Sequence, residues 1–318
     1  MKNNELMISF GPVPSRRLGQ SIGINNIPPK NCTYSCIYCQ LGRTTNIQTK
    51  RQTFYKPQKI FESVKNKIKK AEEKGESIDY ITFVPDGEPT LDINLGKEIE
   101  MLKSLNFKIA VITNSSLLWK KEVIEELSYA DYVSLKIDTI NNKIWNMINR
   151  PHRLLKIDKI LSGLTEFSQI FDAELSTETM LIKDINNNSQ ELDAIANFIK
   201  NINPKKSFIS IPIRPPAEKF VTCPREFDIN MAYNILKKKG LDAELLTDYE
   251  KNSFAFTGDA EKDLLSILSV HPMREDSLTS FLLKAKSSWH VIEKLIDEDK
   301  LVVVEYKDKK FYLRKLQK

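Results

Sequence analysis

A regular alternation of strand-like and helix-like segments constrains the fold most strongly. Short apolar runs typical of buried strands are each followed by a segment with apolar residues at helical spacing. The predicted strands span 21–27, 79–84, 107–113, 132–137, 173–182 and 207–213. The predicted helices span 57–74, 95–105, 118–127, 141–149 with 157–171, 190–201 and 225–238. Six such units in strict order predict an α/β fold with a parallel sheet and helices outside it.

Three of the four cysteines lie close together in the loop after the first predicted strand. Cys32, Cys36 and Cys39 fall in residues 31–42 with the spacing C-x3-C-x2-C. Thiolates are the ligands of iron–sulfur clusters, and three of them leave one iron of a [4Fe-4S] cluster open. A closed zinc site needs four ligands, and no fourth Cys or His lies within forty residues on either side. Three cysteines also cannot all pair with one another as disulfides.

The pattern C-x3-C-x-aromatic-C, in which Tyr38 is the aromatic residue, resembles the signature of the radical S-adenosylmethionine (radical SAM) superfamily. The resemblance implies that S-adenosyl-L-methionine (SAM) chelates the open iron and receives one electron from the reduced cluster. A 5′-deoxyadenosyl radical then results, which abstracts hydrogen from a substrate. The resemblance also implies a partial (β/α)6 TIM-like barrel with its chemistry at the carboxyl ends of the strands.

Three further runs resemble one branch of that superfamily, the iron–sulfur oxidoreductases related to the wyosine-forming tRNA synthases. They are G-P-V-P-S-R-R-L-G before the cysteines, D-G-E-P-T-L at 86–91 and S-I-P-I-R-P-P-A-E at 210–218, and the likeness covers roughly residues 8–225. The archaeal wyosine synthases carry extra cysteines for a second cluster, which this chain lacks. We therefore expect a related enzyme whose substrate is unassigned.

Gly87 and Glu88 follow the second predicted strand and are similar to the superfamily's GGE motif, which holds the SAM amino group. Asp86 stands where the first glycine of that motif is found. Glycine lets the backbone approach a ligand, and a glutamate accepts hydrogen bonds from an ammonium. The alternative is a tight turn capped by Asp86.

Polar residues also follow the third and fourth strands. Asn114 ends the third, while Ser134, Lys136 and Asp138 share one face at the end of the fourth because strand side chains alternate. These positions resemble SAM ribose and carboxylate contacts, and the alternative is an internal Lys136–Asp138 ion pair. The resemblance also makes Ile213, at the end of the sixth strand, a weak candidate for an adenine contact.

Cys223 is the remaining cysteine. An ordinary free thiol is one interpretation. The alternatives are a catalytic hydrogen-atom donor to a substrate radical, or a ligand of a second cluster, which one cysteine cannot hold alone.

The positive charge of the chain is concentrated near its beginning. Residues 1–60 contain nine basic residues and one acidic residue, a net charge of +8. Because the whole chain has a net charge of +6, the remaining residues carry about −2. This excess is either a solvated basic face or an entrance that attracts an anionic substrate such as tRNA. The resemblance implies a reductant such as ferredoxin or flavodoxin as a further partner.

The alternation stops near residues 252–258, which predicts a radical SAM core over 1–250 and a second domain over 251–318. Three predicted helices, 259–270, 274–283 and 287–297, precede two predicted strands, 301–306 and 310–316, an order typical of a winged helix-turn-helix. Residues 258–318 hold twelve basic and eleven acidic residues, a poor footprint for nonspecific DNA binding. Protein docking, dimerisation or a stabilising appendage are the alternatives.

No apolar run approaches the length of a membrane span, and residues 1–10 lack the apolar region of a signal peptide. We therefore expect a cytoplasmic enzyme without a membrane partner. Two other functions fit the same motifs, a radical SAM enzyme that modifies a peptide or protein, and a cluster-bearing winged-helix regulator that senses redox state. Cleavage of SAM on reduction separates an enzyme from a sensor.

Overall fold

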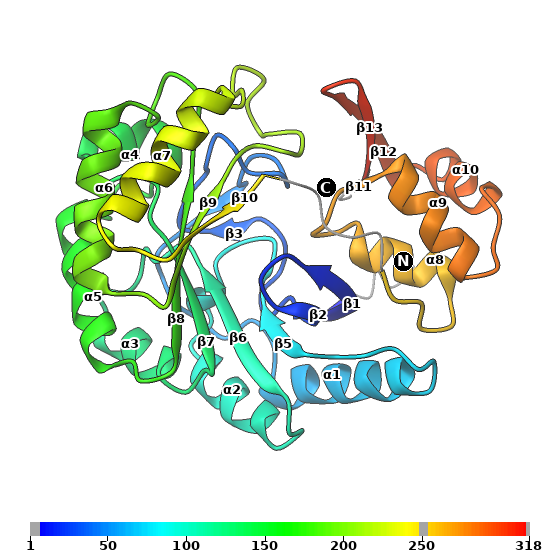
Figure 1. The fold of residues 1–318 in the computed structure, drawn as a ribbon. Helices are drawn as coiled ribbons and strands as arrows, with labels where there is room; N and C mark the ends of the chain where they lie inside the picture. The colour runs from blue at the N-terminus through cyan, green and yellow to red at the C-terminus, as the bar shows by residue number, and fades with distance from the viewer. Residues whose placement is uncertain (1–6, 248–253, 316–318) are drawn as a thin grey trace.

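The protein was analysed as a computed structural model, which describes residues 7–247 and 254–315 (Figure 1). The predicted boundary between residues 250 and 251 lies outside the described residues, as does the end of the last predicted strand at Leu316. No helix within the described ranges is both long enough and apolar enough to cross a lipid bilayer.

The main body is built on a curved sheet of eight strands in the order β1-β2-β5-β6-β7-β8-β9-β10. β1 runs antiparallel to β2, and the remaining neighbours are parallel. The strands span Ser9–Ser15, Gly19–Ile24, Tyr80–Phe83, Lys108–Thr113, Tyr132–Lys136, Glu174–Met180, Lys206–Ser210 and Ala243–Leu246. The predicted α/β fold with a mostly parallel sheet is therefore confirmed.

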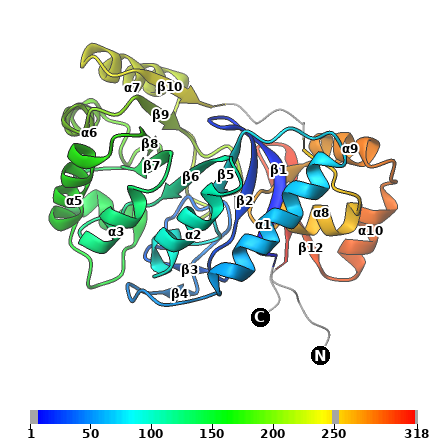
Figure 2. The same ribbon diagram turned by 90° about the horizontal axis from the view of Figure 1, so that it is seen from below.

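Helices surround this sheet, most of them on its outer face (Figures 1 and 2). They are α1 to α7, spanning Pro57–Glu72, Leu95–Lys103, Lys121–Leu127, Asn142–Asn149, Ile157–Ile170, Ser189–Ile202 and Glu226–Lys238. Helix α1 buries Ile60, Val64, Ile68 and Ala71, the residues at helical spacing, and begins at a proline that suits the first turn. The side chain of Asn188 caps α6 by accepting from the Glu191 amide.

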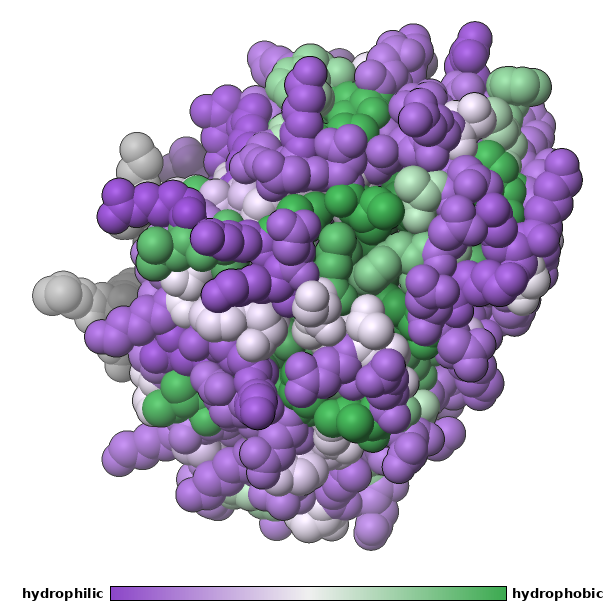
Figure 3. Space-filling view, turned by 90° about the vertical axis from the view of Figure 1, so that its left-hand side faces the viewer, coloured by the Kyte–Doolittle hydropathy of each residue, from purple (hydrophilic) through white to green (hydrophobic). Residues whose placement is uncertain are grey.

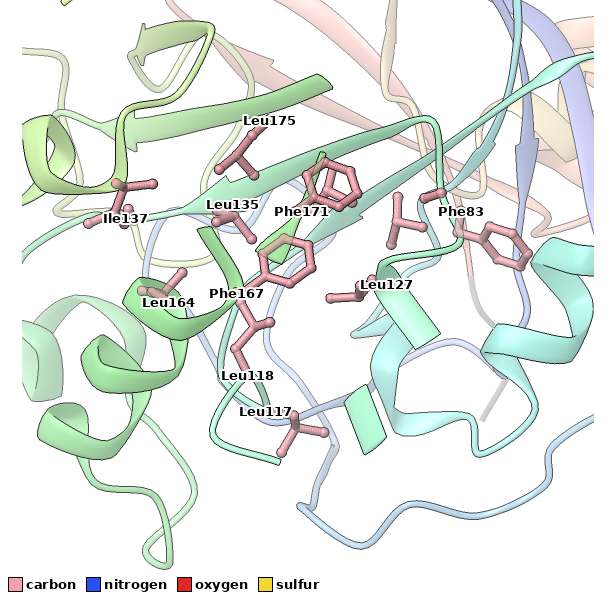
Figure 4. Close-up of a cluster of buried hydrophobic side chains, with 14 of the residues drawn as sticks. Phe83, Leu117, Leu118, Leu127, Leu135, Ile137, Leu164, Phe167, Phe171 and Leu175 are labelled. Carbon is pink, nitrogen blue, oxygen red and sulfur yellow. The ribbon is translucent and has the colours of Figure 1, made fainter. Parts of the chain in front are cut away.

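The main apolar core lies between these helices and the sheet. Figure 4 shows part of it, where Phe167 and Phe171 stack with ring centroids 4.9 Å apart near Leu135 of β7 and Leu175 of β8. The opposite, solvent side of the helices is mostly hydrophilic, with small hydrophobic areas between the charged side chains (Figure 3). This amphipathic division fixes the helices to one side and leaves the inner face of the sheet for the polar residues described below.

Two strands that pattern reasoning did not predict extend the sheet at its two edges. β1 contains Pro12 and Pro14, which cannot donate ladder hydrogen bonds and are rare within central strands. Because β1 is an edge strand, the missing donors are tolerated there. β10 is a short A-E-L-L run after α7, and β9 ends at Ser210, earlier than the predicted Ile213.

Residues 254–315 form three helices and a three-stranded antiparallel sheet. The elements are α8 Ala260–Ile267, β11 Met273–Arg274, α9 Glu275–Lys284, α10 His290–Asp297, β12 Leu301–Tyr306 and β13 Lys309–Arg314. Lys307 and Asp308 form the predicted hairpin turn, both with positive φ. The apolar cluster of this unit also contains Phe10 and Val13 of β1, so the unit packs directly on the edge of the main sheet. Its winged-helix character and its status as a separate domain remain predictions.

Candidate active site

The three clustered cysteines lie in the loop between β2 and α1, at the carboxyl end of the parallel sheet. This loop contains β3 (Asn31–Cys32), which pairs with β4 (Asn46–Ile47). Backbone hydrogen bonds from Cys39 to Cys36 and from Gly42 to Cys39 fold the loop into consecutive turns. All three thiols are free and half-buried. In the described ranges no group of three His, Cys, Asp or Glu side chains is placed to hold a single metal ion.

The electrostatics of the thiols indicate that they converge. Burial raises the pKa of Cys32 well above its usual value, and the neighbouring Cys36 thiol raises it further. Burial also raises the pKa of Cys36 to about 12, with the Asp138 carboxylate as the next cause. Ligand thiols must be deprotonated, so these thiols need a bound cation to become thiolates.

Two asparagine side chains donate to the sulfur atoms. Asn114 Nδ2 lies 3.4 Å from Cys32 Sγ, and Asn149 Nδ2 lies 3.4 Å from Cys36 Sγ. Hydrogen bonds to the sulfurs are one of the means by which proteins tune iron–sulfur clusters. Three converging thiols with amide donors on two of them therefore fit an iron–sulfur cluster.

Gly87 is required by a close approach between two loops. Its backbone lies against that of Asn31, and a Cβ at position 87 would lie 2.0 Å from the Asn31 carbonyl oxygen. The Glu88 amide donates to the same oxygen at 3.1 Å. No side chain fits between the cysteine loop and the loop after β5, so glycine is needed here.

Glu88 is fully buried and engaged by the protein itself. Its carboxylate accepts hydrogen bonds from the Thr113 hydroxyl at 2.6 Å and from the backbone amide of Asn114 at 2.7 Å. It also accepts from the backbone amide and the hydroxyl of Thr90, at 3.1 and 2.7 Å. Burial nevertheless raises its pKa. The carboxylate thus ties the loop after β5 to the end of β6, which positions Asn114.

Ser134 and Lys136 of β7 share the inner face of the sheet, where Ser134 contacts Arg17 and Lys136 lines the cavity described below, and Asp138 lies two residues beyond the end of the strand. Asp138 accepts from the Tyr38 hydroxyl at 2.5 Å and from Asn149 at 2.9 Å. Lys136 Nζ lies 2.7 Å from Glu178 and, at 3.9 Å, more loosely beside Asp138. The Lys136–Asp138 ion pair is therefore the weaker contact of this lysine.

Glu178 on β8 and Arg17 on the turn between β1 and β2 were not assigned from the sequence. Arg17 contacts both Glu178 and the Ser134 hydroxyl, and Ser210 donates to Glu178 at 2.8 Å. Burial alone raises the pKa of Glu178, but the charges of Lys136 and Arg17 outweigh it and hold that pKa well below its usual value. The sequence signals were the pair Arg16-Arg17 in the run G-P-V-P-S-R-R-L-G and the glutamate near the end of the predicted strand 173–182.

A cavity of about 360 Å³ lies inside the carboxyl end of the sheet. Of the predicted residues, Cys39, Gly87, Asn114, Lys136 and Ile213 line it, together with Tyr38 and Glu178. Four of the others, Cys32, Glu88, Asp138 and Ser134, contact residues of this wall or their neighbours. Asn114 contacts both Cys32 and Glu88, Tyr38 contacts Asp138, and Arg17 contacts Ser134. The volume falls within the range of roughly 300–1,000 Å³ typical of small-molecule sites.

The family model of the radical SAM superfamily matches residues 26–199, which is more than half of the chain and includes all three cysteines of the loop. The chain belongs to the radical SAM superfamily. It is therefore a radical SAM enzyme, and membership implies SAM and an iron–sulfur cluster as cofactors.

The chain is also similar to known relatives and solved structures. The chain is 46% identical to a UPF0026 protein of Methanocaldococcus jannaschii, over 98% of this chain and 97% of the relative. A radical SAM methyltransferase from Sphaerobacter thermophilus is similar in fold, with a TM-score of 0.54 and 16% identity over 71% of this chain and 66% of that chain. The structure of TYW1 with a lysine-pyruvate adduct is similar in fold as well, with a TM-score of 0.53 and 16% identity over 70% of this chain and 75% of that chain. At these identities the two structures show the fold alone.

Cys223 of this radical SAM protein lies away from the other cysteines. Its thiol donates to the Pro212 carbonyl at 2.8 Å, and Lys307 of the β12–β13 turn lies 2.6 Å from its sulfur. Cys223 is not among the described residues that line the cavity. The structure thus places it at a contact between the sheet and residues 254–315.

Four of the nine basic residues in 1–60 form internal ion pairs within the described ranges. Arg17 contacts Glu178, Lys30 contacts Asp86, Arg43 contacts Glu218 and Arg51 contacts Glu126. The hydrogen bond from Arg43 is the largest cause that lowers the pKa of Glu218, to about 2. Much of the local excess of +8 is therefore balanced by acidic residues from later in the chain.

Proposed function

We propose that this enzyme reductively cleaves SAM at a [4Fe-4S] cluster held by Cys32, Cys36 and Cys39 and uses the product for hydrogen abstraction. The observation that supports this proposal most is the clustering of three half-buried thiols in one loop, two of them hydrogen-bonded by Asn114 and Asn149 and the third, that of Cys39, on the cavity wall. Three cysteine ligands leave one iron of such a cluster for SAM.

When bound, the cluster supplies one electron to the sulfonium of SAM, which yields methionine and a 5′-deoxyadenosyl radical. The residues of this chain bind and orient the reactants. Gly87 offers backbone polar groups to the SAM amino group. Asn114 offers its side-chain amide to the same group. Lys136 offers a positive charge to the SAM carboxylate, held in place by Glu178, while Ile213 offers an apolar surface to the adenine. Ser134 and Asp138 position Arg17 and Tyr38.

We further propose the domain organisation predicted from the sequence. Residues 1–250 form a partial (β/α)6 barrel, and residues 251–318 a winged helix-turn-helix. The six parallel βα units support the first part, and the three helices followed by an antiparallel hairpin support the second. Ferredoxin or flavodoxin is the class of reductant that such a cluster accepts, and an anionic molecule is the class of substrate we infer.

Product analysis tests the proposal. Anaerobically reconstituted protein, given SAM and dithionite, is expected to form 5′-deoxyadenosine and methionine in equal amounts. Cys36→Ser removes a ligand and is expected to reduce this product to background, while Cys223→Ser, which changes a cysteine outside the cavity, keeps it within about twofold. A redox sensor holds the cluster without forming either product, and that result would contradict the proposal.

A further inference from the structure

Residues 254–315 are fixed against the edge of the main sheet. Their apolar cluster includes Phe10 and Val13 of β1, and the Ala255 amide donates to the Pro12 carbonyl at 3.0 Å. Figure 2 shows α1 and α8 beside β1, and the largely buried pair Lys67–Asp263 joins the two helices at 3.4 Å. This unit therefore has a defined position relative to the cavity.

The loop between α8 and β11 contributes directly to the cavity wall. Val270 and His271 line the cavity together with Gln40, which follows the third cluster cysteine in the sequence. Gln40 donates to the Val270 carbonyl at 3.2 Å and accepts from Arg214 at 2.9 Å. The wall at this point thus combines the cysteine loop, the segment after β9 and the C-terminal unit.

Arg214 and His271 form the centre of this contact. Arg214 Nη2 lies 3.0 Å from His271 Nε2, and a guanidinium only donates hydrogen bonds. Nε2 is therefore the acceptor of this hydrogen bond. The ring of Phe254 packs edge-on against the imidazole at 5.2 Å between centroids, which holds its orientation.

The described residues that line the cavity carry an excess of positive charge. Arg16, Arg17, Lys136 and Arg214 are basic and Glu178 is acidic, so four positive charges face one negative charge, a formal excess of three. A cleft lined by one sign of charge concentrates ligands of the opposite sign. Arginine is well suited to carboxylates and phosphates because its planar fork makes two parallel hydrogen bonds.

We propose that Arg214 and His271 bind the carboxylate or phosphate of a small anionic substrate, so that residues 254–315 complete the substrate site. This inference rests on the proposed function, since it names the substrate class of the same cavity. It assigns the C-terminal unit to substrate binding in place of duplex reading.

Calorimetric titration of anaerobically reconstituted protein, with and without saturating SAM, tests the proposal. The probes are inorganic phosphate for the phosphate arm and succinate for the carboxylate arm. One of them is expected to bind, and His271→Ala and Arg214→Gln are each expected to weaken it at least tenfold. His290→Ala is the matched control, because His290 is an exposed histidine of the same unit, and it should leave the affinity within twofold.

A second measurement uses the unmutated protein and does not depend on how the variants fold. The anion that binds is expected to slow modification of His271 by diethyl pyrocarbonate, with no effect on His290. The proposal is overturned if neither anion binds, if binding is insensitive to His271→Ala, or if bulk tRNA binds at this site while both small anions do not. Loss of SAM cleavage with intact anion binding would instead count against the proposed function alone.

Discussion

At the scale of single residues, the groups that surround the cysteine sulfur atoms are the main evidence for a cluster site. The spacing of the three cysteines is local in sequence and predicts their convergence. The amide donors do not follow from that spacing, because Asn114 lies 82 residues from Cys32 and Asn149 lies 113 residues from Cys36. Only the fold brings these groups together, so the role of Asn149 was not predicted.

Removal of the Asn149 amide tests that role. An N–H donor to a ligand sulfur stabilises the reduced cluster, so Asn149→Ala is expected to shift the reduction potential to more negative values. Potentiometric titration followed by absorbance measures the shift. Asn146→Ala, on the exposed side of the same helix, should leave the potential unchanged. Equal potentials in all three proteins would exclude a hydrogen bond to the cluster.

Glu98 on α2 gives the chain a pH dependence unrelated to the cofactors. Burial raises its pKa to about 9, and the nearby Asp92 carboxylate adds to this. In the unfolded chain the pKa returns to about 4.5. The folded state therefore binds a proton that the unfolded state releases. The resulting stability is complete below pH 4.5 and is lost as pH rises through 9.

Urea unfolding at pH 6 and pH 9 measures this effect. We expect the free energy of unfolding to fall by up to ~4 kcal/mol over this interval on account of Glu98. Glu98→Gln is expected to remove most of that decrease, whereas Glu100→Gln, on the exposed face of the same helix, should retain it. A slope that is identical in the wild type and Glu98→Gln would show that Glu98 is ionised at neutral pH.

At the scale of elements, pattern reasoning predicted the central strands and helices because each buries a continuous apolar face. It missed β1 and β10 at the two edges of the sheet, for different reasons. Pro12 and Pro14 argue against a strand unless the segment is known to lie at an edge, and β10 is short with a glutamate at its second position. Edge position is a property of the whole sheet and is not visible in either segment.

An ion pair between Lys67 and Asp263 connects α1 with α8. Asp263 accepts from Lys67 at 3.4 Å and from the amide and hydroxyl of Thr257, and both charged groups are largely buried. Asp263→Ala leaves the Lys67 ammonium buried without this partner. It is expected to reduce the free energy of unfolding by about 3 kcal/mol and to speed proteolysis of residues 254–315.

Asp276→Ala serves as the control for this experiment, because Asp276 is exposed and pairs only across the surface with Arg274. Denaturant unfolding combined with limited proteolysis compares the variants. If Asp263→Ala and Asp276→Ala behave alike, the buried ion pair does not hold the C-terminal unit against the sheet.

At the scale of the whole molecule, charge counts along the sequence were the least reliable guide. The excess of +8 in residues 1–60 suggested a basic entrance, but acidic residues from β8, α3 and the segment after β9 pair with much of it. The positive excess of the cavity wall combines Arg16 and Arg17 from this stretch with Lys136 and Arg214 from later in the chain. The contact between Arg214 and His271 joins residues that lie 57 positions apart, and no local sequence pattern predicts it.

The central claim is that three cysteines hold a cluster whose remaining iron is open to SAM. Electron paramagnetic resonance of the dithionite-reduced protein, recorded with and without SAM, tests it most directly. We expect a [4Fe-4S]⁺ signal whose g values change when SAM is added, because SAM chelates the open iron. A cluster signal that SAM does not alter, or a protein that assembles no cluster anaerobically, would contradict the account.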